Sequence, residues 1–257
     1  MRSLIIAHAD EKRLAEALAS GADAVVVDLA LAPPGERAAA RARAARFLKE
    51  ARAEAGRSEL VVGVNALESG ETDPDLDAVM GSAPDAVLLR HSFGAASVQQ
   101  LSAKLAVREA DFALPDGATR IIAVVDTARG VLNMASYRGS TARLSGVAWS
   151  AASLSADIGA ETDRDPSGAY AGALRLARDL TLLAAAAAGV AAIDAAFADV
   201  ADAEGLRAEA IAARRDGFAA KLAISPAQAR IVSDVFRSRS IPLTERTPFS
   251  TNRCSKA

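Results

Sequence analysis

The sequence is poor in several features that mark particular classes of protein. Only one of its 257 residues is cysteine, Cys254, so no disulfide can form within the chain, and a thiol in this terminal segment is a poor candidate for a nucleophile. Aromatic residues make up 4%, which argues against the exposed stacking platforms that bind single-stranded nucleic acid. The formal net charge is −2, which gives no electrostatic reason to expect a nucleic acid or a membrane as a partner.

Long hydrophobic runs are also absent. The longest apolar stretch, residues 180–193, contains Gly189 and is mostly alanine, so it is too short and too weakly hydrophobic to span a bilayer. The apolar run at residues 4–7 is too short for the core of a secretory signal. We therefore expect a cytoplasmic protein. No G-x-G-x-x-G, P-loop or zinc-finger spacing occurs either, which argues against the common nucleotide and zinc motifs.

What the sequence does contain is a regular alternation of two patterns, in a chain that is 51% hydrophobic. Short continuous apolar runs, typical of strands buried on both faces, occur at residues 4–7, 24–29, 60–65, 86–89, 121–126, 146–150, 191–194 and 221–224. Helical patterns lie between them, for example at residues 10–20, 36–55, 95–106, 167–188, 201–216 and 226–237. Strands that alternate with helices imply parallel β-structure, and this number of units predicts an α/β fold, the (β/α)8 TIM barrel.

The chain shows one change of character along its length. Residues 1–237 read as a single barrel domain, with no linker that would divide it. Residues 238–257 lose the periodic pattern and carry Pro242 and Pro248. This segment is expected to be either a flexible tail or a piece that packs on a neighbouring subunit.

Polar residues end most of the predicted strands, where the active site of such a barrel forms. They are His8, Asp28, Asn65, Arg90, His91, Asp126, Ser150, Asp194 and Ser225. Several of them have a structural explanation as well as a functional one. Asp28 could cap the loop that follows it, Asp126 could cap a helix or bind a metal, and Asp194 reads more as a structural residue. Arg90 and His91 could bind an anion or simply be exposed, and His8 could be a base, although it has no visible partner.

Five segments of the sequence resemble motifs of one superfamily, that of the HpcH/HpaI aldolases and citrate lyase beta subunits. They are R-S-L at 2–4, A-S-G-A-D-A-V-V-V-D-L at 19–29, I-I-A-V-V-D-T-A-R-G at 121–130, the I-D and D-A-E-G-L pieces within 193–206, and the G-F and P-A-Q pieces within 217–228. The resemblance covers residues 2–236. It implies a barrel, a homo-oligomer (trimer or hexamer), and Mg²⁺-assisted carbon–carbon bond chemistry on a short acyl-CoA ester or a 2-oxo acid.

The same comparison shows where the chain departs from the family pattern. Two acids that follow the family's second strand are replaced by Ala30 and Leu31, and Gly63 replaces an arginine that in the family serves the substrate carboxylate. Arg90 and His91 stand in a segment where the family has a lysine and an acid. We therefore expect Asp28, Arg90 and His91 to be the candidates for catalysis.

Further departures affect the metal and substrate contacts that the resemblance implies. Asp126 replaces the magnesium glutamate, Ser153 replaces the magnesium aspartate, and Ser225 replaces a histidine. Mg²⁺ prefers carboxylate and water oxygens, so Asp126 is expected to be its main ligand and Ser153 a weak one. The residues expected to bind substrate are Asn65, Arg90, Asp194 and Ser225.

The sequence thus predicts a citrate lyase beta subunit-like protein in which most of the family's catalytic residues are replaced. If active, it is a carbon–carbon lyase of the aldolase type. The alternative is a catalytically inactive homologue that binds an acyl-CoA or serves as an assembly or regulatory subunit.

Overall fold

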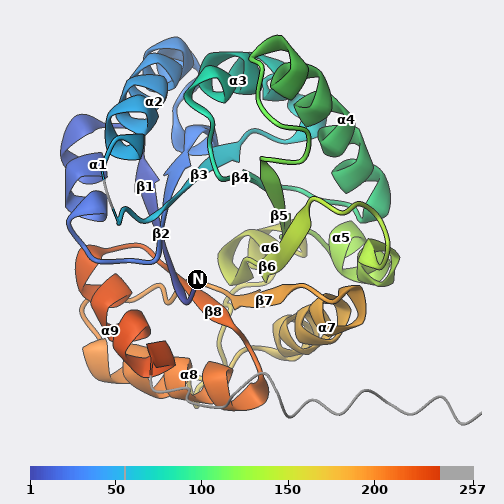
Figure 1. Cartoon of the computed structure of the whole chain (residues 1–257). Helices are drawn as coiled ribbons and strands as arrows, with labels where there is room; N and C mark the ends of the chain where they lie inside the picture. Colours follow the sequence, from blue (N-terminus) through green and yellow to red (C-terminus); the bar gives the residue numbers. More distant parts are fainter. Residues whose placement is uncertain (55, 238–257) are drawn as a thin grey trace, which may run out of the picture.

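The apolar runs form parallel strands that close into a barrel in the order β1 to β8, each paired with its neighbours in the chain and β1 paired with β8 (Figure 1). The computed structural model describes residues 1–54 and 56–237. The strands are β1 (Ser3–His8), β2 (Ala24–Asp28), β3 (Glu59–Val64), β4 (Ala86–Leu89), β5 (Arg120–Val125), β6 (Leu144–Trp149), β7 (Ala191–Asp194) and β8 (Ala220–Ala223). The predicted TIM barrel is confirmed.

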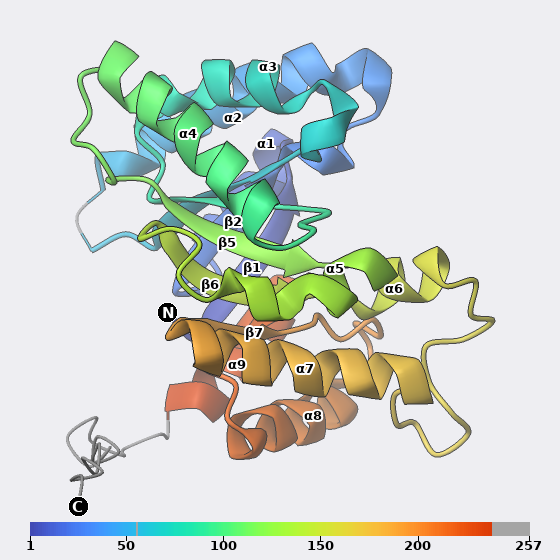
Figure 2. The same ribbon diagram turned by 90° about the vertical axis from the view of Figure 1, so that its right-hand side faces the viewer.

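Helices cover the outside of the barrel and connect its strands. They are α1 (Glu11–Leu18), α2 (Arg37–Arg52), α3 (Thr72–Val79), α4 (Ala95–Asp111), α5 (Ala128–Asn133), α6 (Ala151–Asp157), α7 (Gly172–Ala188), α8 (Ala203–Asp216) and α9 (Pro226–Arg237). Short 3₁₀ turns occur at Leu29–Leu31, Pro34–Glu36, Leu67–Ser69, Met80–Ser82 and Met134–Tyr137. Figure 2 shows α7 and α8 stacked beside β7, with the connection from α6 to α7 extending beyond the strand ends.

In two of these helices, α1 and α8, capping residues explain where the helix begins or ends. The Asp10 side chain accepts the backbone N–H of Arg13 at the start of α1, and Asp202 accepts that of Gly205 at the start of α8. Such caps satisfy N–H groups that have no partner within the helix. Helix α8 ends at Gly217, whose positive φ of 119° suits glycine.

The apolar side chains form two separate layers because successive residues of a strand face opposite sides of the sheet. In β5, for example, Ile122 and Val124 belong to the inner cluster, whereas Ile121, Ala123 and Val125 belong to the outer cluster that packs against the helices. This alternation decides which polar residues at the strand ends face the barrel mouth. It assigns Asp28, Arg90, Asp126 and Ser150 to the inside, and Asp194 to the outside.

Within the described part of the chain, no helix is long and apolar enough to cross a membrane. The prediction for residues 238–257, a flexible tail or a segment packed on a neighbouring subunit, lies outside the described residues.

Candidate functional site

An ion pair spans the mouth of the barrel from β4 to β2. Arg90 directly follows β4, and its Nη2 and Nε atoms donate to Oδ2 of Asp28 at 2.5 and 3.1 Å. Asp28 is fully buried, and its other oxygen accepts the backbone N–H of Ala30 at 3.0 Å. The carboxylate is thus the turn cap that the sequence allowed and also the partner of Arg90, and its role in catalysis stays a prediction.

Strand β3 lies between these two strands, and Gly63 is the residue over which the pair passes. Gly63 is the register partner of both Asp28 and Leu88, two residues before Arg90. A Cβ atom at position 63 would lie 2.7 Å from Oδ1 of Asp28, which is closer than such atoms approach. The absence of a side chain at Gly63 is therefore what allows Asp28 to take up this position.

The charges around Arg90 are arranged to keep it protonated. Burial disfavours the charged guanidinium, but the carboxylates of Asp28 and then Asp126 outweigh this and raise the pKa of Arg90. Nε and Nη2 bind Asp28, and Nη1 donates to no acceptor among the described residues. Arg90 therefore keeps donor capacity at the mouth.

Asp126 lies on the next strand, directly after β5, and is buried with one oxygen unused. Its Oδ1 accepts the backbone N–H of His91 at 3.0 Å. Oδ2 has no hydrogen-bond partner among the described residues, and Nε2 of His91 lies 3.7 Å from it. Burial raises the pKa of Asp126, against the lowering effects of His91 and Arg90. The result is an under-satisfied buried carboxylate between two nitrogen-bearing side chains.

The loop that carries His91 is held firmly against β5 and α5. His91 itself has a φ of 51°, an unusual conformation for a residue other than glycine. The backbone N–H of Ser92 donates to the carbonyl of Val124 at 3.2 Å, and the Tyr137 hydroxyl donates to Oγ of Ser92 at 2.8 Å. A Cβ at Gly130 would lie 2.7 Å from the carbonyl oxygen of Ser92, so the loop approaches α5 as closely as a glycine permits.

Ser150 and Ser153 occupy the first turn of α6. Ser150 caps the helix, since its Oγ accepts the backbone N–H of Ser153 at 3.3 Å, and the same Oγ donates to Oγ of Ser153 at 3.0 Å. Both side chains are half-buried. The hydroxyl of Ser153, one of the two predicted metal ligands, is thus already an acceptor for its neighbour.

Asn65 and Ser225 both make structural contacts with neighbouring elements. The Asn65 side chain and backbone N–H both donate to Oδ2 of Asp75, at 2.8 and 2.9 Å, which ties the end of β3 to α3. Oγ of Ser225 accepts the backbone N–H of Gln228 at 3.2 Å, at the start of α9. Among the described residues no hydrogen bond joins either side chain to the Asp28–Arg90 pair, and their role in substrate binding stays a prediction.

His8 lies at the end of β1, apart from the pair formed by His91 and Asp126. It is exposed and lines a hollow of about 390 Å³ together with Arg13, Ile224 and Ser225. No carboxylate within the described chain forms an ion pair with it. Its register partner on β2 is Asp28, whose carboxylate binds Arg90 instead.

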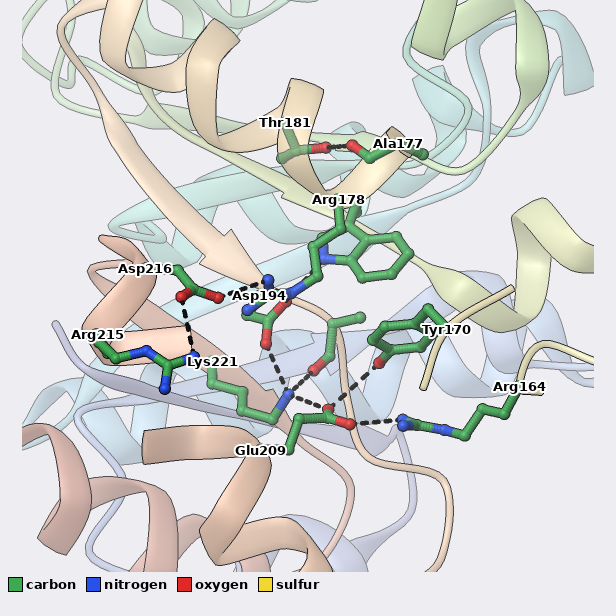
Figure 3. Close-up of polar contacts among 12 residues, drawn as sticks. Arg164, Tyr170, Ala177, Arg178, Thr181, Asp194, Glu209, Arg215, Asp216 and Lys221 are labelled. Atoms are coloured by element: carbon green, nitrogen blue, oxygen red, sulfur yellow. Dashed lines mark hydrogen bonds and ion pairs between the residues drawn. The ribbon is translucent and has the colours of Figure 1, made fainter. Parts of the chain in front are cut away.

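Asp194 faces away from the mouth, into the layer between the barrel and the helices (Figure 3). It is fully buried and accepts from Nζ of Lys221 at 2.9 Å, from Nε1 of Trp149 at 2.9 Å and from Nε of Arg178 at 3.2 Å. Burial opposes the charge, but Lys221 and Arg178 hold the pKa of Asp194 below its usual value. We therefore do not place Asp194 among the residues that can reach a substrate at the mouth.

Lys221 is the centre of this network and was not singled out by the strand-end pattern. Its Nζ is fully buried and donates also to the carbonyl of Ala195 at 2.6 Å and to Glu209 of α8 at 2.7 Å (Figure 3). The available signal was a lysine inside the apolar β8 run. A charge in such a strand needs buried partners, and those come from β7 and α8.

The donor set at the mouth does not fit a resident Mg²⁺ ion. Within the described chain no group of three or more histidine, cysteine, aspartate or glutamate side chains is placed to hold a metal. Asp126 offers one free oxygen, but the positive charge of Arg90 acts on the same carboxylate and would repel a dication. Mg²⁺ requires near-octahedral oxygen coordination, usually with one or two carboxylates. The predicted ligands Asp126 and Ser153 do not provide it by themselves.

The sequence and the fold of the chain match one known family of barrels. The model of the HpcH/HpaI aldolase/citrate lyase family matches residues 3–226. The chain belongs to this family. The family predicted from the motifs is thereby confirmed.

Three relatives illustrate the range of this family. The citrate lyase subunit beta of Leuconostoc mesenteroides is 33% identical over 70% of the chain, and the match spans 58% of that relative's length. A (3S)-malyl-CoA thioesterase of Cereibacter sphaeroides is 31% identical over 91% of the chain and 75% of its own length. A solved structure of the citrate lyase beta subunit of Mycobacterium tuberculosis, complexed with oxaloacetate and magnesium, superposes with a TM-score of 0.76 at 32% identity, covering 91% of this chain and 96% of that one.

Proposed function

We propose that this family member binds a short acyl-CoA ester or a 2-oxo acid at the barrel mouth and catalyses carbon–carbon bond cleavage or formation there. The relatives support the substrate class, because one bears the name of a malyl-CoA thioesterase and another was solved with oxaloacetate. Fold alone does not carry an activity, so the proposal depends on the groups at the mouth.

The observation that carries the proposal is the free oxygen of Asp126. A buried acceptor with no donor costs about 1–3 kcal/mol, a cost usually relieved by a bound partner. Arg90 adds donors for an anionic group, and His91 adds a group that can exchange a proton. Together they suit a small molecule that combines a carboxylate or enolate oxygen with a hydroxyl.

Ligand-dependent melting temperatures test this function. We expect acetyl-CoA and glyoxylate to raise the melting temperature, because a ligand that binds only the native state stabilises it by mass action. Arg90→Gln should weaken binding of the carboxylate-bearing ligand roughly 10- to 100-fold, since charge-assisted hydrogen bonds contribute about 1.5–3 kcal/mol.

The control variant is Arg138→Gln, which removes an exposed arginine from the turn after Met134–Tyr137. It should bind like the parent protein. No shift with either ligand in folded protein would contradict the proposal, and equal losses in both arginine variants would show only a general charge effect.

A second candidate function is favoured by the donor set around Asp126. If the family's chemistry depends on a metal that this mouth does not hold, the protein is a catalytically inactive homologue that binds an acyl-CoA or serves as an assembly or regulatory subunit. It then binds the CoA ester without forming product, with or without Mg²⁺. A product assay run beside the binding measurement separates the two candidates.

A homo-oligomer, trimeric or hexameric, is part of the same proposal because the family resemblance implies it. Light scattering after size-exclusion chromatography gives the mass directly. A mass of about one chain, at concentrations where the protein is folded, would contradict it. The cytoplasmic location stays a prediction.

A further inference from the structure

Helix α7 carries a row of apolar residues on its outer surface. They are spaced alternately three and four positions apart and consist of Ala173, Leu176, Leu180, Leu183 and Ala187. Leu176 and Leu183 are 57% and 64% exposed, and both alanines are exposed as well, whereas Leu180 is half-buried against the outer core cluster. This spacing aligns the side chains along one face of a helix, which is the pattern of a helix that packs against another helix.

The row is distinct from the face that attaches α7 to the barrel. That face consists of the buried residues Leu174, Ala177, Thr181, Ala184 and Ala185. Helix α5 lies beside α7 (Figure 2), and its Leu132 is 83% exposed, the highest value among the large hydrophobic residues of the described chain. Single exposed leucines are ordinary on protein surfaces, but an aligned row of them indicates an interaction surface.

The order of residues along the row indicates that its partner is a second copy of this chain. Read from either end, the row runs alanine, leucine, leucine, leucine, alanine, with Leu180 at its centre. A two-fold contact requires that each residue and its partner exchange places between the two copies. Two antiparallel α7 helices meet this condition, because Leu180 then lies opposite its equivalent in the other copy. Leu176 lies opposite Leu183, and the alanines at the two ends lie opposite each other.

The charges of α7 favour this partner over a membrane surface. Helices that lie on a membrane are rich in lysine and arginine on their polar face. The exposed residues Arg175 and Asp179 carry opposite charges, and Arg178 is already paired with Asp194 and Asp216. The small alanines at both ends of the row also allow another helix to approach closely, since the distance between packed helices depends on the side chains at the contact.

We propose that the α7 row is a two-fold interface at which two copies of this chain pack their α7 helices in antiparallel orientation. The row is roughly 22 Å long at 1.5 Å per residue, and pairing removes its leucines from water. The family resemblance implies a trimer or hexamer without assigning a surface. A two-fold contact forms a dimer or joins two trimers into a hexamer, but it cannot by itself close a trimer. The inference does not depend on the chemistry proposed at the barrel mouth.

The mass of the full-length protein in solution tests the interface. Size-exclusion chromatography with light scattering gives this mass for the parent protein and for Leu183→Glu at equal concentration. A carboxylate in an apolar contact must lose its hydration without gaining a partner, so we expect the mass to fall to half of the parent value. This halving is expected whether the parent is a dimer or a hexamer. Because Leu183 is largely exposed in the single chain, the circular dichroism spectrum should not change.

The matched control is Val107→Glu. Val107 lies on α4 and is 59% exposed, so the same charge is introduced at a similarly accessible site of another helix. This variant should keep the parent mass.

Disulfide formation tests the antiparallel arrangement and does not require a long-lived complex. In a Cys254→Ser background, which removes the only cysteine, Leu180→Cys should cross-link to itself under mild oxidation, because the two Cα atoms at the axis come within roughly 4–7 Å. Leu176→Cys and Leu183→Cys should cross-link when the two variants are mixed. Val107→Cys should remain a single chain on a denaturing gel at the same concentration.

The outcomes separate the α7 interface from other modes of assembly. A mass unchanged by Leu183→Glu, or an equal fall in Val107→Glu, would overturn the interface. A Leu180→Cys protein that runs as a single chain after oxidation would do the same. A parent trimer that Leu183→Glu leaves intact removes only the α7 contact and retains the assembly implied by the family. A parent mass of one chain at every concentration contradicts both.

Discussion

At the scale of single residues, the absence of a side chain at Gly63 shapes the barrel mouth. It allows Asp28 to lean over β3, and Asp28 in turn holds the Arg90 guanidinium. The absence of a side chain at position 63 is therefore a condition for the contact between Asp28 and Arg90.

Replacing Gly63 by alanine should disrupt this arrangement. The new Cβ would meet Oδ1 of Asp28 at 2.7 Å, so the carboxylate must move away from Arg90. We expect a loss of about 1–3 kcal/mol in the free energy of unfolding, the usual cost of overpacking, measured by urea titration.

The matched control is Gly35→Ala, where a Cβ would meet nothing within 4 Å. It should leave the free energy of unfolding nearly unchanged. A Gly63→Ala protein as stable as the control would show that Asp28 has another acceptable position.

The polar residues at strand ends were predictable from sequence because their positions follow directly from the apolar runs. Arg90, His91 and Asp126 were selected in that way, and they lie together. The role of Gly63 was not readable, because it depends on the register that sets Gly63 beside Asp28. The unused oxygen of Asp126 likewise follows from the conformation of a loop, which the sequence pattern leaves open.

At the scale of elements, the buried network around Lys221 joins β7, β8 and α8. Sequence reasoning read Asp194 more as a structural residue but still placed it at the mouth among the expected substrate contacts, whereas it faces the helices. Strand β7 reads Ala-Ala-Ile-Asp, so no polar residue before Asp194 marks which face is which. Alternation is informative only when polar residues reveal it, and fully buried parallel strands conceal it.

Replacing Lys221 by methionine should destabilise the protein strongly. The change removes the donor shared by Asp194 and Glu209 and leaves a buried carboxylate without its closest cation. Breaking one side of a buried ion pair typically costs about 3–5 kcal/mol. Urea unfolding measures this loss.

Lys104→Met is the control, because Lys104 pairs with Asp73 at a partly exposed site. Its loss should be below about 1 kcal/mol, as for other surface pairs. Similar effects in the two variants would argue that the network around Lys221 contributes nothing beyond its packing.

The predicted helical segments include the long periodic helices and leave out the short ones, α3, α5 and α6. Helix α3 (Thr72–Val79) was not predicted, because its first turn holds Asp73, Pro74 and Asp75 and its apolar residues are too few to show a period. Its position is set by tertiary contacts, since Asp75 binds both Asn65 and Arg41. Such contacts join segments far apart in the chain and leave no local pattern.

At the scale of the whole molecule, the barrel was predictable because one pattern repeats around the entire chain. Four carboxyls that hold this barrel together have pKa values below the ordinary range. Burial opposes this in each case, but Arg2 lowers the pKa of Asp23, Arg57 that of Asp85, Arg143 that of Glu109, and Lys221 with Arg178 that of Asp194.

The free energy of unfolding should therefore fall in acid. The unfolded chain takes up protons at these groups near pH 4, while the folded protein resists protonation to lower pH, so stability is present above about pH 4 and is lost as pH falls through the depressed folded values. The pKa of Asp126 is raised in the folded protein, so its contribution to the pH dependence of the free energy of unfolding has the opposite sign. Urea titrations between pH 7 and pH 3 measure the trend.

Asp85→Asn identifies one contributor to this trend. The variant should be less stable at pH 7, because Arg57 loses its carboxylate partner, and its stability should decline less steeply in acid. An acid dependence as steep as that of the parent protein would assign the effect to other carboxyls.

The enclosure of the Lys221 amine also has a consequence for chemical labelling. Acylating reagents attack free amines, and Lys12 and Lys49 present theirs at the surface, whereas Lys221 is fully buried with three acceptors around its nitrogen. Residue 221 should therefore resist acylation in the native barrel and react only when α8 separates from β8. Mass spectrometry of the peptide that contains Lys221, after timed labelling, would then report how often α8 separates from β8.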